Sequence, residues 1–402
     1  MKDSPFLIAG GGIGGLAAAI GLARKGVASV VLEQARELGE IGAGIQLGPN
    51  AFRSFDQLGV GDAARAIAVY VDNLRLMDAM TARELYRVPI DAPFRERFGN
   101  PYAVVHRGDL HRILADACRA SPLVDLRTAS QVLRYEQDGS SVTAFTASGS
   151  ASGRALIGAD GLWSKVRSQM LGEVAPRVSG HTTYRSVIPV DRMPEDLRWN
   201  AATLWAGPKC HLVHYPLSGW KVFNLVVTFH NSAPEPVAGL PVTHEEVLAG
   251  FRHIHPMAQQ IIEIGSNWKM WVLCDRDPVD KWVDGRVALL GDAAHPMMQY
   301  FAQGACMALE DGVALADKVA AHPGDVEGAL LAYHSARVLR TARVQLQSRW
   351  IGDHIYHPVG PHASLRNALL GRMSPPDFHD AVAWLYGGSG LAEDPLAAAG
   401  VR

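Results

Sequence analysis

Two polar side chains in one short segment have the types and the spacing for acid–base chemistry on a small molecule. His211 and Tyr215 lie four residues apart in the segment 210–216, which alternates in the manner of a strand. Alternation places both side chains on one face, roughly 13 Å apart along the strand. A neutral imidazole can accept a proton from a ligand hydroxyl, and a phenolic hydroxyl can donate to a carboxylate. The same pattern equally fits a histidine that is simply buried in a sheet.

A glycine-rich turn near the start of the chain predicts a nucleotide-binding site. The turn follows the apolar run 6–9 and opens a helical pattern, and a second apolar run ends at Glu33. Gly10 and Gly12 would let the backbone approach a pyrophosphate at the helix N-terminus, and Gly15 would let helix and strand pack closely. Glu33, about 20 residues further on, would accept hydrogen bonds from a ribose hydroxyl. This turn does not distinguish NAD from FAD, and it comprises Gly10, Gly11, Gly12, Ile13, Gly14 and Gly15.

Two later apolar segments also end in a turn that contains glycine and aspartate. The segment 155–158 leads into Asp160, and the segment 286–290 leads into Asp292. Ligands of an open α/β sheet bind beyond the carboxyl ends of its strands, so both carboxylates are well placed to meet a cofactor. A helix that begins near Gly304 follows the second turn and could present backbone N–H groups to an anion. Each turn alone is ordinary, whereas all three in this order favour one shared cofactor site.

The composition narrows the class of protein. The 402 residues include 38 basic and 40 acidic ones, which argues against nucleic-acid binding. No apolar run approaches the ~20 residues of a membrane span, and the first strand begins too early for a signal peptide to precede it. Four cysteines without a CxxC pair favour reduced thiols and a cytoplasmic location. The 16 histidines show no recognisable ligand spacing, so no metal site is predicted.

The order of the patterns predicts an α/β (α+β) fold with interleaved domains. A Rossmann-like nucleotide-binding domain is expected from three separated segments, 1–70, 100–175 and 280–330. A mainly β substrate-binding domain is expected from the segments between them, 71–99 and 176–279. The remaining residues, 331–402, are expected to form a C-terminal helical segment that braces the nucleotide-binding domain or contributes to a homodimer.

The three motifs together resemble those of the single-component (group A) flavoprotein aromatic hydroxylases, the para-hydroxybenzoate hydroxylase-like family. The resemblance covers nearly the whole chain and implies that the Rossmann-like domain binds FAD. It places Asp160 near FAD and a transient pyridine nucleotide, and Asp292 on the ribityl chain. At Cys306 this chain differs from relatives that often carry asparagine. The implied cofactor-binding residues are Gly10, Gly12, Ile13, Gly14, Gly15, Glu33, Gln46, Arg107, Asp160, Asp292, Gly304, Ala305 and Cys306.

Within that family, the substrate residues are most similar to those of 3-hydroxybenzoate 6-hydroxylases. The similarity implies that NAD(P)H and O2 are used to hydroxylate a hydroxybenzoate through a flavin C4a-hydroperoxide, with NADH the expected reductant. The substrate would be a small aromatic carboxylate, 3-hydroxybenzoate, and the product 2,5-dihydroxybenzoate (gentisate). The implied catalytic residues are His211 and Gln299, and the implied substrate-binding residues are Tyr215, Asp72, Tyr102 and Pro296.

Several alternatives stay open at this point. A salicylate 1-hydroxylase, which decarboxylates to catechol, or a hydroxynicotinate monooxygenase would share the scaffold motifs and differ only in pocket residues. A flavoprotein dehydrogenase or oxidase would insert no oxygen, and product analysis distinguishes it. A flavin-binding protein without catalytic activity would not need the polar residues His211, Tyr215 and Gln299. The sequence also leaves open whether NADH or NADPH is the preferred reductant and whether the protein forms a homodimer.

Overall fold

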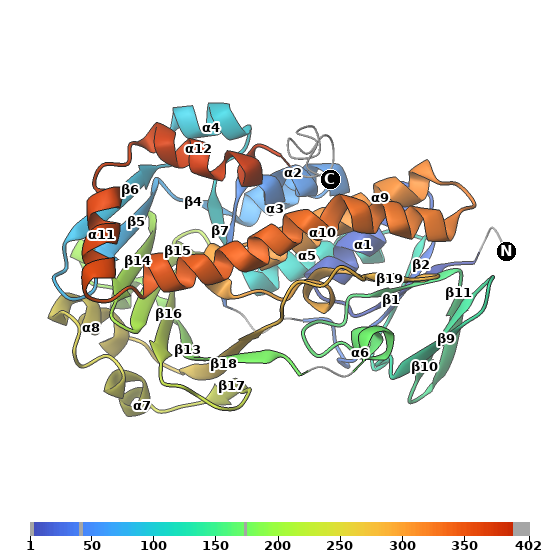
Figure 1. Ribbon diagram of the computed structural model, residues 1–402, viewed down its shortest axis with the longest axis horizontal. Helices are drawn as coiled ribbons and strands as arrows, with labels where there is room; N and C mark the ends of the chain where they lie inside the picture. Colours follow the sequence, from blue (N-terminus) through green and yellow to red (C-terminus); the bar gives the residue numbers. More distant parts are fainter. Residues whose placement is uncertain (1–3, 40–42, 173–174, 389–402) are drawn as a thin grey trace.

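Two large sheets carry the fold, and one long helix runs across both of them (Figure 1). The computed structural model describes residues 4–39, 43–172 and 175–388, so the predicted segments 1–70 and 331–402 extend beyond the described residues. The long helix is α10 (Val326–Ile351). No described helix has both the length and the apolar character to span a membrane. The predicted α/β class with a C-terminal helical segment is confirmed.

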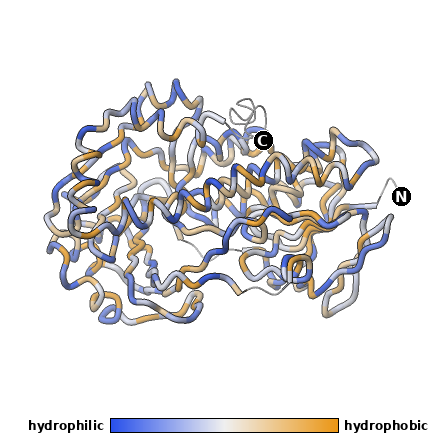
Figure 2. Tube along the Cα trace, viewed as in Figure 1, coloured by the Kyte–Doolittle hydropathy of each residue, from blue (hydrophilic) through white to orange (hydrophobic). Residues whose placement is uncertain are grey.

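The first sheet, which we call the cofactor sheet, has six strands in the order β19-β20-β12-β1-β2-β8. All neighbours are parallel except β19 and β20. The inner strands are apolar along their whole length, as expected when helices cover both faces, and Figure 2 shows this hydrophobic interior. Its strands come from distant parts of the chain: β1 (Phe6–Ala9), β2 (Ser29–Leu32), β8 (Val124–Arg127), β12 (Ala155–Gly158), β19 (Val283–Asp284) and β20 (Val287–Leu289).

Two helices that flank the cofactor sheet, α1 (Ile13–Arg24) and α9 (Gly304–Ala321), pack unusually closely against each other. Their N-termini lie on the same side of this sheet. A Cβ atom on Gly312 of α9 would lie 2.7 Å from the carbonyl carbon of Ala17 in α1. One on Gly21 would lie 2.9 Å from the carbonyl oxygen of Gly312. Only glycine therefore allows this approach. The other helices around this sheet are α2 (Pro49–Leu58), α3 (Gly61–Ile67), α5 (Arg107–Arg119) and α6 (Lys165–Leu171).

The second sheet, which we call the substrate sheet, has eight strands in the order β17-β18-β13-β16-β15-β14-β5-β6. Neighbours are antiparallel except β14 and β5. Helices α7 (His244–Ala249) and α8 (Pro256–Glu263) contribute to the apolar core on one face, and the other face looks toward the cofactor sheet. Its strands are β5 (Asn73–Asp78), β6 (Glu84–Pro89), β13 (Arg177–Pro189), β14 (Ala201–Gly207), β15 (Cys210–Leu217), β16 (Val222–His230), β17 (Ala238–Pro241) and β18 (Lys269–Asp275).

Strand β15 has the two-faced character that its sequence predicts. Cys210 and Leu212 pack into the core on the α7–α8 face. Val213 and Tyr215 belong to the other core, which is continuous with the cofactor sheet. A period of two residues therefore assigns His211 and Tyr215 to the face that looks toward the cofactor sheet.

Smaller elements connect and cover the two large sheets. Strands β3 (Gly44–Leu47), β7 (Ala103–His106) and β4 (Val69–Tyr70) form one small sheet, and β11 (Gly149–Gly153), β10 (Val142–Thr146) and β9 (Arg134–Gln137) form another. After α10 come a π-helical turn (Gly352–Tyr356), α11 (Pro361–Leu370) and α12 (Pro375–Tyr386). Helix α12 packs on α2 and α4 (Ala92–Phe98), so the C-terminal helices cover the open side of the substrate sheet (Figure 1).

Candidate active site

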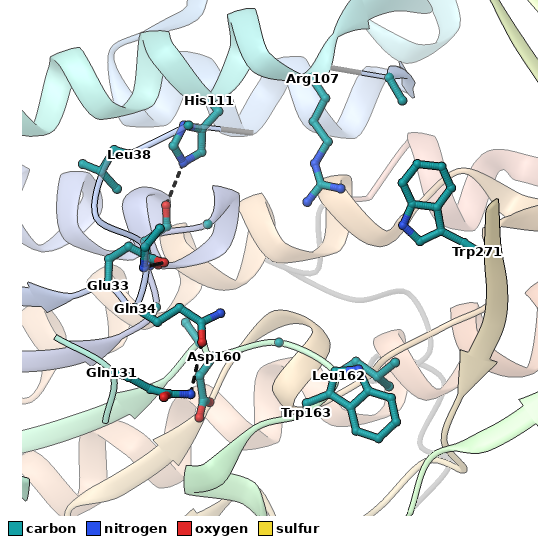
Figure 3. Close-up of a pocket in the computed structure, with 18 of the residues that line it drawn as sticks. Glu33, Gln34, Leu38, Arg107, His111, Gln131, Asp160, Leu162, Trp163 and Trp271 are labelled. Atoms are coloured by element: carbon teal, nitrogen blue, oxygen red, sulfur yellow. Dashed lines mark hydrogen bonds between the residues drawn. The ribbon is translucent and has the colours of Figure 1, made fainter. Parts of the chain in front are cut away.

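A cavity of about 1230 Å³ lies between the carboxyl ends of the cofactor sheet and the substrate sheet (Figure 3). Two of the three motifs meet in it: the glycine-rich turn with Glu33 and the turn with Asp160 line the cavity, and Arg107 extends into it from the start of α5. Cationic side chains outnumber carboxylates along its wall, which favours an anionic ligand. The cations are Arg107, Lys165, Arg185, Lys269 and Arg276, and the carboxylates are Glu33, Glu37 and Asp160.

The glycines of the turn divide into two roles. Gly10 has φ of +106°, and a Cβ atom there would lie 2.4 Å from the carbonyl oxygen of Ala159. A Cβ atom on Gly15 would lie 2.0 Å from the carbonyl oxygen of Gly10, and one on Gly14 would meet Leu290 at 2.7 Å. These positions keep the helix close to the strands. Gly12, in contrast, has no atom within 4 Å of a Cβ position and faces the cavity, so it leaves room for a ligand.

Glu33 is held against the turn at the end of β2. Its carboxylate accepts hydrogen bonds from the backbone N–H groups of Gly11 at 2.6 Å and Ala35 at 2.7 Å. On the other side of the turn, His111 Nε2 lies 2.8 Å from the carbonyl oxygen of Gly11 (Figure 3). The sequence analysis missed His111, because a histidine inside an amphipathic helix carries no motif.

Asp160 lines the cavity, but its carboxylate oxygens also cap helix α6. They accept hydrogen bonds from Ser164 Oγ at 2.5 Å, from Lys165 N at 2.8 Å and from Val166 N at 3.2 Å. Burial raises the pKa of Asp160, and these hydrogen bonds oppose that rise. The side chain therefore has a clear role in fixing the turn after β12.

The last motif brings Asp292 and the N-terminus of α9 to the same side as Arg107. Asp292 lies in a short 3₁₀ turn after β20, and desolvation raises the pKa of its carboxyl, an effect that His295 and Arg107 oppose. Gly304, the first residue of α9, has open space at its Cβ position. Cys306 is buried, and burial raises its pKa to about 12, so its thiol belongs to the core. Ala305, between them, is partly buried.

A second cavity of about 950 Å³ lies between the substrate sheet and the C-terminal helices. Gln46 and Tyr102 line it together, and the Tyr102 hydroxyl donates to Gln46 Oε1 at 2.7 Å. The structure thus places Gln46, a predicted cofactor residue, beside a predicted substrate residue. Most of the remaining wall is apolar, which suits an aromatic ligand.

His211 lies in an aromatic cage next to the second cavity. Its ring centre is 4.8 Å from that of Tyr356 and 5.6 Å from that of Tyr300, and both tyrosines line the cavity. Its Nδ1 lies 2.7 Å from Nε2 of His357. Burial holds the pKa of His211 well below its usual range, and His357, His181 and His230 lower it further. The imidazole is therefore neutral near pH 7 and can accept a proton.

Tyr215 lies at the other end of the same strand face, against β3. A Cβ atom on Gly44 would come within 2.5 Å of the Tyr215 ring, and the Gly44 N–H donates to Asn224 Oδ1 at 2.8 Å. Burial raises the pKa of Tyr215, an effect that nearby Arg185 opposes. The hydroxyl therefore stays protonated and is available as a donor.

Gln299 links the two halves of the site. It comes from a 3₁₀ turn (Gln299–Phe301) between β20 and α9, and its amide donates to the hydroxyls of Thr183 at 3.1 Å and Thr228 at 3.2 Å. Its Oε1 accepts from Arg185 Nη2 at 3.0 Å. Arg185, which also lines the first cavity, was missed by the sequence analysis. An arginine within a strand of threonine, tyrosine and valine residues was the signal that could have revealed it.

Two predicted substrate residues lie away from this assembly. Asp72 is exposed and lines neither cavity, and its backbone pairs with Asn200 and Ile90. Pro296 is buried, and its carbonyl oxygen accepts from Gln345 Nε2 at 3.0 Å. This hydrogen bond joins Pro296 to α10, and the roles of Asp72 and Pro296 in substrate binding stay predictions.

The comparison with known families decides the class of protein. A family described as FAD binding domain matches residues 3–348. The chain belongs to this family. The flavoprotein is 57% identical over 383 residues to 3-hydroxybenzoate 6-hydroxylase 1 of Aquipseudomonas alcaligenes, covering 95% of this chain and 97% of that protein. It is 50% identical to 3-hydroxybenzoate 6-hydroxylase of Polaromonas naphthalenivorans (strain CJ2), covering 98% of each.

Solved structures agree with this assignment. A Klebsiella pneumoniae HpxO variant complexed with FAD superposes with a TM-score of 0.85 and is 26% identical, covering 94% of this chain and 97% of that one. The flavoprotein is thus an FAD-dependent monooxygenase with the fold of the group A hydroxylases. Its own residues fit FAD, because Gly12 leaves open space where the N-terminus of α1 faces the cavity and cations outnumber carboxylates along the cavity wall.

Proposed function

We propose that the flavoprotein converts 3-hydroxybenzoate to 2,5-dihydroxybenzoate, with NAD(P)H as reductant and O2 as co-substrate. The observation that carries this proposal is the pairing of His211 and Tyr215 on one buried face of β15, with a neutral imidazole at one end and a protonated phenol at the other. These groups match a hydroxyl and a carboxylate on one small aromatic ring. Relatives named for this reaction at 50% and 57% identity support the choice of substrate.

His211 would take the proton of the substrate hydroxyl. With Nδ1 donating to His357 Nε2, its Nε2 is left as the acceptor. Loss of that proton pushes electron density onto the ring carbons ortho and para to the oxygen. When bound, FAD would pass electrons from NAD(P)H to O2, of which one oxygen atom would be transferred to the ring and the other would leave as water.

Tyr215 and Arg185 would hold the carboxylate and so select the ring position. Tyr215 offers a hydroxyl donor, and Arg185 offers a guanidinium that hydrogen-bonds to Gln299. A carboxylate fixed at this end and a hydroxyl fixed at His211 leave one orientation of the ring, which would present the para carbon for attack. The apolar wall of the second cavity would exclude water from the reaction.

The test is a panel of hydroxybenzoates, with salicylate and 6-hydroxynicotinate included, assayed for NADH and NADPH oxidation and for product identity. We expect 3-hydroxybenzoate to give 2,5-dihydroxybenzoate in near-equal amount to the reductant consumed. Reductant consumption that yields only H2O2 with every compound would overturn the proposal. Catechol from salicylate as the main product would replace it with the decarboxylating reaction.

We also propose a homodimer in the cytoplasm. Four large apolar side chains, Leu331, Leu339, Leu346 and Trp350, are exposed along α10, and a second copy of the chain would cover them. The four free cysteines are compatible with a reducing compartment. Sedimentation of the purified flavoprotein tests the dimer, and a monomer at micromolar concentration would contradict it.

A further inference from the structure

Three histidines from other parts of the chain gather around the proposed base, His211. His181 is on β13, His211 on β15, His230 at the end of β16, and His357 follows the π-helical turn. Ring centres of His230 and His357 are 5.3 Å apart, and those of His181 and His357 are 5.4 Å apart. One ring nitrogen from each of His181, His230 and His357 lies within 4.8 Å of the others. The fold thus creates a cluster that no sequence spacing indicated.

We propose that His181, His230 and His357 form a binding site for a late first-row divalent cation, for which Zn²⁺ is the natural probe. Three neutral imidazoles with one position left for water is a recurring zinc geometry, and imidazole also suits Ni²⁺ and Cu²⁺. Zn–N bonds of 2.0–2.1 Å in a tetrahedral site place the ligating nitrogen atoms roughly 3.4 Å from one another. The three ring nitrogens lie within 4.8 Å of one another, and the ring centres of His181 and His230 are 3.3 Å apart, so binding would turn these two rings away from each other while it draws the nitrogens together.

The hydrogen bonds of the cluster have the arrangement that metal-binding histidines use. The Tyr300 hydroxyl is hydrogen-bonded to Nδ1 of His181, and His211 is hydrogen-bonded to Nε2 of His357. These bonds leave Nε2 of His181 and Nδ1 of His357 for a metal, and the latter is a buried nitrogen without a hydrogen-bond partner. In metal sites, the second ring nitrogen of a ligand is held by such a partner.

The cluster is also accessible to a cation. His230 is only partly buried, which gives the cluster a route to solvent. The exposed carboxylate of Asp353 favours positive charge at His230, whereas Lys209 disfavours it.

A metal at this site would switch off the proposed base, an effect that rests on the proposed function. Metal on Nδ1 of His357 would move the proton of that ring to Nε2, which would then donate to Nδ1 of His211. His211 would have to carry its own proton on Nε2. The two rings hold two protons before and after, but the nitrogen that faces the substrate hydroxyl would change from acceptor to donor. Bound metal would therefore uncouple hydroxylation from reductant consumption.

The first measurement is calorimetric titration of the FAD-loaded protein with ZnCl2 in a buffer that does not bind zinc. We expect one saturable site per chain, weakened more than roughly tenfold in His230→Ala and in the milder His230→Asn. His244→Ala, on α7 and outside the cluster, is the matched control and should bind as the unmodified chain does. Absorption of bound Co²⁺ beyond the flavin bands should report tetrahedral ligands. Absence of saturable binding, or binding by both His230 variants as tight as by the unmodified chain, would overturn the site.

The second measurement is the amount of hydroxylated product per NADH at increasing zinc. We expect this ratio to fall as the site fills, to recover with EDTA, and to stay constant in His230→Ala. Zinc that binds without changing the ratio would refute the link to His211 and leave the site itself established. A flavoprotein that makes no product even without zinc would refute the proposed function, whereas the titration would still decide the metal site.

Discussion

Helices α9 and α10 and one face of the substrate sheet both bury polar side chains. The helices pair opposite charges with one another, whereas the sheet face, among the described residues, buries imidazoles without a charged partner. In the α9–α10 layer, Arg337 contacts Glu310 at 2.6 Å and Asp311 at 2.7 Å, and Arg340 contacts Glu310 at 2.8 Å, all at zero or near-zero exposure. On the substrate sheet, the imidazoles of His181 and His211 have only tyrosine or histidine hydrogen-bond partners in the described part of the chain.

This difference separates residues that stabilise the fold from residues that are proposed to react. Paired charges lock the two helices and the Gly291 turn together, because Asp311 also accepts from the Gly291 N–H at 3.0 Å and from His295 at 2.6 Å. The charged groups of this network are already paired with one another, so they are not available to a substrate. Imidazoles that desolvation keeps neutral retain a lone pair on one ring nitrogen, and both the proposed base and the proposed metal site depend on such lone pairs.

Removing one partner of the network should give the largest effect. Arg337→Met leaves two buried carboxylates with less compensation, and we expect a loss of about 3–5 kcal/mol in the free energy of unfolding. Urea unfolding followed by circular dichroism measures it. Arg119→Met, which breaks an exposed pair with Asp116, should cost less than about 1 kcal/mol. Equal losses in the two variants would contradict a structural role for the network.

Replacing the proposed base should affect chemistry and leave the network intact. His211→Asn should lower the rate of product formation by roughly 100-fold or more, because the substrate hydroxyl loses its proton acceptor. Rapid-mixing measurements of flavin oxidation with product analysis follow this change. His214→Asn, on the same strand but the opposite face, is the matched control and should retain product formation per NADH. Product loss in His214→Asn alone would reverse the assignment of faces.

Acid should weaken the network through Asp311. Burial alone would raise the pKa of this carboxyl, but His295 and Arg337 outweigh that effect and lower it to about 2. Because an unfolded aspartate titrates near 3.9, the stabilisation of about 2 kcal/mol is complete above about pH 4 and is lost as pH falls toward 2. The difference in unfolding free energy between the unmodified chain and Asp311→Asn should shrink over this interval. A difference independent of pH would contradict the pairing.

Gln299 joins the two regions, and its loss should have the smallest effect. Gln299→Leu removes hydrogen bonds to Thr183, Thr228 and Arg185, and we expect a cost of about 1 kcal/mol in stability together with less product per NADH. Thermal unfolding and product analysis on the same samples test both parts. An unchanged product ratio would show that Gln299 serves only to join the halves.

The C-terminal segment shows where sequence reasoning reached its limit. Its helical character was predictable from periodicity, and the structure confirms it. The contribution of His357 and Tyr356 to the environment of His211 was not, because nothing in a local pattern shows which distant strand a turn will meet. The hydrogen bond from Gln345 on α10 to the carbonyl oxygen of Pro296 was not predictable for the same reason.

The sequence by itself determined the cofactor half of this protein. The glycine turn, Glu33 and the strand-end aspartates follow from backbone geometry over a few residues, and local rules describe such geometry well. The two faces of strand β15 were likewise predictable, because successive side chains of a strand point to opposite faces. Only the tertiary structure decided that Arg185 lies against Gln299 and that His181, His230 and His357 share one cluster. These residues come from different strands, from the turn before α9 and from the C-terminal segment, and only the packing of these parts brings them together.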